Sequence, residues 1–156
     1  MLHDKTLLRT SCKQMLTSDF KQLGIIKIKF LTSIAAARDW HRHRTGMPWS
    51  FTLALKNDQP FIHSNFIIPE QWQQHTKKLL KKSFNLFNGK IESLYAFPYG
   101  TTLEITGFFT LPDLLYTLEL RSKTIGANSE YKEAALKALL LLKETLGDEV
   151  SKLLII

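Results

Sequence analysis

A run of basic residues between positions 38 and 44 is the segment of this chain best suited to binding an anion. It reads Arg-Asp-Trp-His-Arg-His-Arg and directly follows the apolar run 34–37. Guanidinium groups bind phosphate in a bidentate geometry, and an imidazole beside them can add a hydrogen bond. Because such a charge density destabilises a fold through repulsion, we expect an anionic ligand or partner. The alternative is a solvated helix C-terminus, where cations interact favourably with the helix dipole.

Helical spacing divides this basic cluster into two parts. Arg38, His41 and Arg42 share a neighbourhood, because residues three and four apart meet on one face of a helix. His43 and Arg44 point elsewhere and could serve a second ligand group or a second subunit. Histidines two positions apart face different ways on a helix, and no cysteine or carboxylate lies at a ligand spacing nearby. We therefore expect no metal site here.

Other candidate residues carry weaker signals. Arg121 ends an apolar segment, where it could bind an anion or simply interact with the end of a helix. Lysines at 77, 78, 81 and 82 form a basic face that is either solvated surface or a patch for nucleic acid or membrane. The three tryptophans, Trp40, Trp49 and Trp72, could stack on a planar ring or pack in the core. Without a nucleophile elbow, Walker loop, dinucleotide-binding motif or metal motif, any chemistry would need a cofactor.

Composition limits the class of protein. The chain has 156 residues and a net charge of +7, which fits one domain that favours anions. Cys12 is the only cysteine, so no intrachain disulfide can form and a reducing compartment is expected. No apolar run reaches the roughly 20 residues of a membrane span, and the first residues lack a signal-peptide layout. We expect a soluble cytoplasmic protein with no membrane partner.

The pattern along the chain predicts an α+β fold, with a small, mainly antiparallel sheet packed with several helices. Alternation at 25–31 predicts a half-buried strand, and Thr32-Ser33 can cap a helix from Ile34 to about Arg44. Further strands are expected at 51–55 and 101–109, and segment 57–60 is expected to be a loop. The other expected helices are 4–17, 69–87, 112–121 and a last one containing Tyr131 and Leu146 and ended by Gly147, while 91–97 could be strand or helix. We expect a single domain over 1–156, comprising an N-terminal helix within 1–20, a core at 21–146 and a tail at 147–156.

Several segments, in the same order along the chain, resemble one known family. Trp40-His41-Arg42-His43-Arg44, after a strand and a helix, resembles the Arg-His-Arg signature of the flavin-dependent thymidylate synthases, the ThyX family. Segment 96–101 is similar to that family's apolar-proline segment, and segments 118–122 and 127–132 are similar to its Leu-Arg loop and C-terminal helix. The resemblance covers roughly 20–146 and is closer to diverged or tandem members, or a fragment of one, than to the compact bacterial enzymes.

The resemblance implies a homotetramer in which FAD lies at subunit interfaces beside dUMP. NADPH and methylenetetrahydrofolate would be co-substrates, and the product would be dTMP. The implied cofactor-binding residues are Arg42, His43, Arg44 and Asn128. The implied substrate contacts are Arg38, Asp39 and Arg121. Arg121 would also be catalytic, since a fixed cation stabilises negative charge developing on the pyrimidine.

Several positions depart from the family pattern. Thr52 stands where the family has a serine, with Ser50 two residues earlier, and either could take the catalytic position. Leu53-Ala54-Leu55 supplies no phosphate-binding arginine, and Asp39 and Asn128 replace the expected glutamine and histidine. Two alternatives therefore stay open. The first is a catalytically degenerate homologue that acts as a structural or regulatory subunit, including in a hetero-complex with a complete synthase. The second is a basic nucleic-acid-binding domain, disfavoured by the lack of a recognition helix and the scarcity of interleaved basic and aromatic residues.

Overall fold

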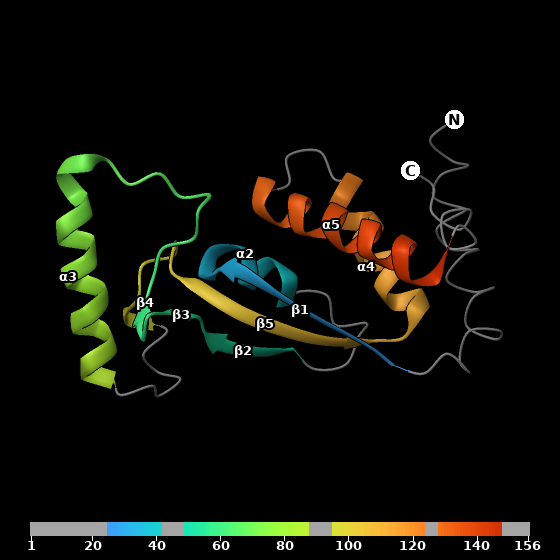
Figure 1. The fold of residues 1–156 in the computed structure, drawn as a ribbon, viewed down its shortest axis with the longest axis horizontal. Helices are drawn as coiled ribbons and strands as arrows, with labels where there is room; N and C mark the ends of the chain where they lie inside the picture. The colour runs from blue at the N-terminus through green and yellow to red at the C-terminus, as the bar shows by residue number, and fades with distance from the viewer. Residues whose placement is uncertain (1–24, 42–48, 88–94, 124–127, 148–156) are drawn as a thin grey trace. The chain divides into compact units, whose positions relative to one another are not determined.

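In a computed structural model, the described residues are 25–41, 49–87, 95–123 and 128–147. They form an α+β fold with a small antiparallel sheet and four helices (Figure 1), which confirms the predicted α+β class and the small antiparallel sheet. The elements are β1 (Ile26–Ser33), α2 (Ile34–His41), β2 (Ser50–Leu53), β3 (Leu55–Lys56), β4 (Gln59–Pro60), α3 (Glu70–Phe87), β5 (Thr102–Phe109), α4 (Leu111–Lys123) and α5 (Ser129–Leu146).

The chain divides into two compact units. One consists of Lys29–Arg42 and Trp49–Thr106, and the other of Met1–Ile28, His43–Pro48 and Gly107–Ile156. The boundary between them falls within β1 and within β5. The first unit contains α2, α3 and strands β2, β3 and β4, whereas the second contains α4 and α5.

The three-stranded sheet has the order β1-β5-β2, with β5 in the centre. In its antiparallel pairing with β5, β2 places Phe51 opposite Ile105 and Thr52 opposite Glu104. Side chains alternate between the two faces of a strand. Phe51 and the fully buried Ile105 therefore share one face, and Thr52 and Glu104 share the other. The sheet has one apolar face and one polar face in this unit.

Alternation along β1 follows the sequence prediction of a half-buried strand. Ile26, Ile28 and Phe30 are half-buried, whereas the lysines between them, Lys27 and Lys29, are exposed. The ammonium group of Lys29 lies 2.8 Å from a carboxylate oxygen of Glu104 in the neighbouring strand β5. The polar face is thus held together across strands by an ion pair as well as by the backbone.

Helix α2 begins at a capped N-terminus. The backbone N–H of Ala36 donates to the side-chain oxygen of Ser33 at 3.1 Å, as expected for an N-cap serine. The N–H groups of Ile34 and Ala35 donate to the carbonyls of Thr101 and Tyr99, at 3.0 Å each. The start of α2 is therefore fixed to the segment that leads into β5.

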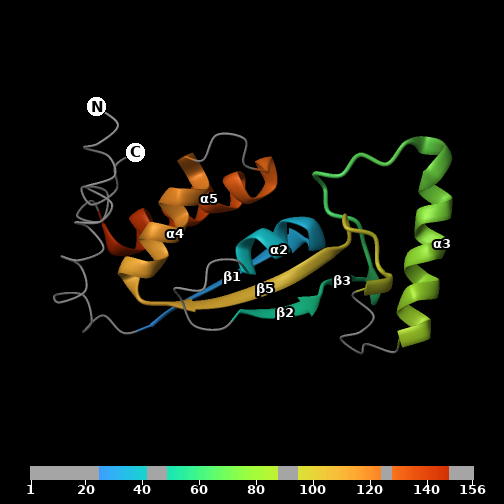
Figure 2. The same cartoon turned by 180° about the vertical axis from the view of Figure 1, so that it is seen from behind.

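The end of α2 packs on aromatic side chains of the sheet. Trp40 is 1% exposed, and its ring centroid lies 5.0 Å from that of Phe30 and 5.9 Å from that of Trp49. The ring of His41 lies 5.8 Å from that of Phe51 on β2. Since Phe30 belongs to β1 and Phe51 to β2, α2 spans the sheet and lies along one face of it (Figure 2). The contact of His41 with Phe51 identifies this face as the one that bears Phe51.

Strands β3 and β4 form a tight hairpin, so the loop expected at 57–60 is confined to residues 57 and 58, and Gln59–Pro60 form a strand instead. The two connecting residues, Asn57 and Asp58, both have positive φ angles, 51° and 57°, the combination required by a type I′ turn. Leu55 pairs with Pro60 and Lys56 with Gln59. Helix α3 packs against β4, at the end of the unit away from α2 (Figure 1).

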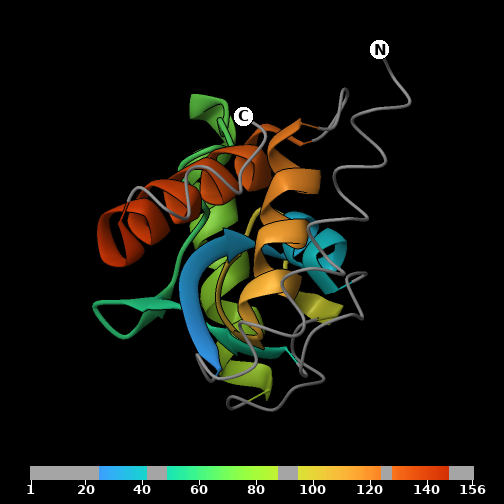
Figure 3. The same ribbon diagram turned by 90° about the vertical axis from the view of Figure 1, so that its right-hand side faces the viewer.

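Helices α4 and α5 pack against each other in the second unit (Figure 3). Leu114 and Leu118 of α4 are fully buried, as is Ala135 of α5. Gly147 has a φ of 79°, a conformation that glycine adopts without steric cost, and its N–H donates to the carbonyl of Lys143 at 2.9 Å. The predicted end of the last helix at Gly147 is confirmed.

Most other element bounds lie close to those predicted. Helix α4 extends the predicted 112–121 by a residue or two at each end, and β2 covers Ser50–Leu53 rather than 51–55. The predicted helix at 4–17, Cys12, residues 42–44 of the α2 prediction, positions 91–94 and the tail from 148 lie outside the described residues. Within the described ranges, none of the helices combines the length and apolarity that crossing a membrane requires.

Candidate functional site

The basic cluster begins where α2 is anchored most firmly. Arg38 is exposed and Asp39 is half-buried on this helix, and Trp40 beside them is buried between two aromatic rings. Arg42, His43 and Arg44 lie outside the described residues. The packing of Trp40 therefore holds the chain in place just before the Arg-His-Arg sequence. Its contact with Trp49 holds a residue that follows this sequence.

Ser50 and Thr52 lie on β2, on the face of the sheet opposite α2. Both are exposed, and they alternate with Phe51, the residue whose ring contacts His41. The Thr52 hydroxyl donates to the carbonyl of Glu104 at 3.4 Å. Strand β2 adjoins α2 through Phe51. The side chains of Ser50 and Thr52, however, lie on the other face of the sheet from α2.

Arg121 lies on α4, and its guanidinium carbon is 4.9 Å from the centroid of the Tyr131 ring on α5. At this distance a guanidinium over an aromatic face gains a cation–π attraction. Arg121 is half-buried and Tyr131 is 6% exposed. The arginine is consequently held by packing on a neighbouring helix rather than extended into solvent.

Asn128 serves as the N-cap of α5. Its side-chain oxygen accepts a hydrogen bond from the N–H of Glu130 at 2.9 Å. The order Asn128-Ser129-Glu130 before a helical apolar pattern indicates this capping role, whereas the resemblance implies that Asn128 binds a cofactor. The oxygen is therefore engaged in holding the start of the helix.

The six candidate residues that the structure describes fall into the two compact units. Arg38, Asp39, Ser50 and Thr52 belong to the first, and Arg121 and Asn128 belong to the second. Within the first unit, α2 and β2 adjoin through the contact of His41 with Phe51. Within the second, Arg121 adjoins α5 through Tyr131.

Two further results concern the site. Within the part of the chain that the structure describes, no group of three or more histidine, cysteine or acidic side chains is arranged to hold a metal ion. A groove beside α3, lined largely by residues of 59–68, was not predicted from the sequence.

Comparison with known proteins adds no assignment. No protein-family profile matches this chain, and no curated protein sequence matches it either.

Proposed function

We propose that this chain is a flavin-dependent thymidylate synthase-like protein that binds FAD, with dUMP beside it, at the cluster Arg42-His43-Arg44. The observation that carries the proposal is the anchoring of Trp40, which is buried against Phe30 and Trp49 immediately before that cluster. A cationic segment that leaves a packed helix end at a fixed point is suited to binding a ligand's phosphates with little reorganisation.

Arg121 and Asn128 would make different contacts with a flavin or nucleotide. Arg121 is half-buried, and its guanidinium is oriented by Tyr131, which suits an anionic phosphate or a pyrimidine ring that gains negative charge. The Asn128 oxygen already accepts the N–H of Glu130, so its amide nitrogen is the group that would donate to a cofactor. The positive charge of Arg121 and the amide donor of Asn128 suit the phosphate and carbonyl groups of FAD and dUMP.

In an active enzyme, these residues would bind and orient rather than supply the redox chemistry. Arg42 and Arg44 would hold phosphate groups, and Arg121 would stabilise negative charge on the dUMP ring. FAD reduced by NADPH would supply the hydride for reducing the methylene group donated by methylenetetrahydrofolate. The resemblance further suggests a homotetramer, with sites completed between subunits.

A second candidate is a homologue that has lost synthase activity and acts as a structural or regulatory subunit, alone or with a complete synthase. The orientation of Ser50 and Thr52 favours it. Both side chains lie on the exposed polar face, opposite the face covered by α2, and neither is positioned to act beside the end of α2. The following residues Leu53–Leu55 also supply no arginine.

The first test is the visible absorption spectrum of the purified protein before and after adding FAD, with its mass measured by light scattering. We expect an oxidised-flavin spectrum that is lost in Arg42→Ala and kept in Lys78→Ala, a matched loss of one positive charge on α3. Turnover of dUMP with NADPH and methylenetetrahydrofolate then separates the two candidates. A stable oligomer that ignores FAD would refute the first candidate and leave the second. A monomer that ignores FAD would refute the first candidate and a subunit that assembles with itself, leaving only a subunit of a hetero-complex with a complete synthase.

A further inference from the structure

A groove lies between α3 and the segment that contains β4 and the residues after it. Its volume is about 620 Å³, within the range of small-molecule sites. All of its lining residues belong to one compact unit. They are Gln59, Pro60, Phe61, Ile62, Phe66, Ile68, Gln73, Thr76, Lys77, Leu80 and Lys81.

The floor of the groove is apolar. Leu80 of α3 is 4% exposed, and Phe61, Ile62 and Ile68 are half-buried. Apolar surface that is left partly open in a concave site favours a ligand that removes it from water. The floor therefore suits an aliphatic or aromatic body.

One wall of the groove is set by a close backbone approach. A Cβ atom added to Gly100 would lie 3.0 Å from two atoms of the Phe66 ring. Two backbone hydrogen bonds hold the segment around this ring: the His63 N–H donates to the Gly100 carbonyl at 2.8 Å, and the Phe66 N–H donates to the His63 carbonyl at 3.0 Å. Phe66 is accordingly packed against the backbone and forms a preformed wall.

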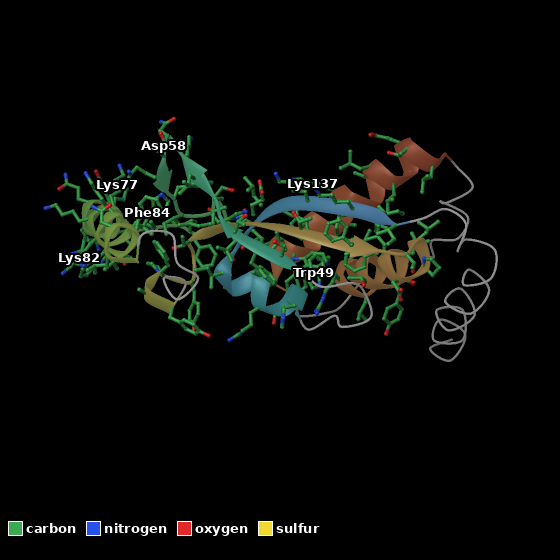
Figure 4. All side chains as sticks on the ribbon, turned by 90° about the horizontal axis from the view of Figure 1, so that it is seen from below. Trp49, Asp58, Lys77, Lys82, Phe84 and Lys137 are labelled. Atoms are coloured by element: carbon green, nitrogen blue, oxygen red, sulfur yellow. The ribbon has the colours of Figure 1, made fainter. Side chains whose placement is uncertain are left out.

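The rim of the groove is cationic. Lys77 and Lys81 are one helical turn apart on α3, and both are exposed. The remaining polar lining residues are uncharged, and none of the lining residues is acidic. Lys82 extends from a different side of α3 than Lys77 (Figure 4). Two of the helix's lysines thus belong to the groove, and Lys78 and Lys82 do not line it.

We propose that this groove binds a small organic anion whose apolar body lies on the floor and whose acidic head group meets Lys77 and Lys81. The head group relieves the repulsion between two ammonium groups one turn apart, and charge-assisted hydrogen bonds to it fix the ligand's orientation. The site does not use Arg42, His43, Arg44 or Arg121, so it is independent of the proposed flavin site.

The test uses a matched pair of fluorescent probes with the full-length protein. The anionic probe is 8-anilinonaphthalene-1-sulfonate, and the neutral probe is N-phenyl-1-naphthylamine, which has the same aromatic body without the sulfonate. We expect the anionic probe to bind more tightly and to be displaced by decanoate, but not by the neutral decanol. Thermal unfolding by circular dichroism verifies that each variant is folded.

Two pairs of variants assign the head-group and body contacts. The double variant Lys77→Gln/Lys81→Gln should lower the affinity for the anionic probe by about tenfold, because charge-assisted contacts are lost. Lys78→Gln/Lys82→Gln removes the same net charge and should weaken it by less than about twofold. Ile68→Asp places a carboxylate in the groove and should weaken it by about tenfold or more. Its control is Ile67→Asp, at a neighbouring side chain that is 94% exposed.

The outcomes separate a specific site from general attraction. Equal losses in the two lysine pairs would show attraction to a basic helix and overturn the proposal. Equal binding of the two probes would overturn the requirement for an anion. An unchanged affinity in Ile68→Asp would place the probe elsewhere. Failure of FAD to bind would leave this proposal untouched, because the probe and its variants involve different residues.

Discussion

Trp40→Ala should destabilise the protein more than any exposed tryptophan substitution. The side chain is 1% exposed and contacts the rings of Phe30, at 5.0 Å, and Trp49, at 5.9 Å. Truncating a buried tryptophan to alanine costs about 3–5 kcal/mol, since transfer free energy is lost and a cavity remains. This is a large part of the roughly 5–15 kcal/mol that stabilises a typical domain. For a chain of this length it corresponds to a fall in Tm of about 6–20 °C.

The assay is urea and thermal unfolding followed by far-UV circular dichroism, which does not depend on the fluorescence of the residue removed. The matched control is Trp72→Ala on α3, whose side chain is 55% exposed and contacts His75 edge-on at 5.9 Å. Its cost should be within about 0.5 kcal/mol, as for surface substitutions generally. Equal losses in the two variants would refute the conclusion that Trp40 anchors α2 on the sheet.

Two further substitutions test polar groups of the fold. Thr102 is fully buried, and its hydroxyl has no hydrogen-bond partner among the described residues. Thr102→Val should therefore raise the free energy of unfolding, measured by urea titration, by about 1 kcal/mol. A lower free energy of unfolding in this variant would show that the hydroxyl makes a hydrogen bond. Asn128→Ala should lower the free energy of unfolding by about 1 kcal/mol, because the N-cap of α5 is lost. Asn128→Asp keeps the hydrogen-bond acceptor, so its Tm should stay near the wild-type value. A fall as large in Asn128→Asp would contradict the capping role.

Features governed by neighbours in the sequence were predictable. Alternation at 25–31 predicted β1, Ser33 was expected to cap the following helix, and Gly147 was expected to end the last one. Each depends on a backbone or side-chain preference that acts over a few residues. The expected loop at 57–60 was right for Asn57-Asp58, which form the turn, and wrong for Gln59-Pro60, which form β4, because a two-residue strand is too short to show alternation. The one local signal of the hairpin was the pair Asn57-Asp58, residue types that tolerate a positive φ.

Features governed by distant pairing were not predictable. The face on which Thr52 lies depends on its register with Glu104, some fifty positions later in the chain. The groove beside α3 combines residues of 59–68 with residues of 73–81, and neither segment has a pattern that indicates a cavity. The assignment of Asn128 shows the opposite case, in which a local capping signal was present but the resemblance suggested another role. The flavin site itself stays a prediction.

The contact between Trp40 and Trp49 also bears on chain entropy. These residues flank the segment that carries Arg42, His43 and Arg44, and their ring centroids lie 5.9 Å apart. Bringing two distant points of a chain together costs entropy. Here that cost is part of the folding free energy of the unit, because the two indoles pack against each other in the folded chain. An anion that binds the basic segment therefore binds between two residues that folding already holds in contact, so less ordering is subtracted from the binding free energy.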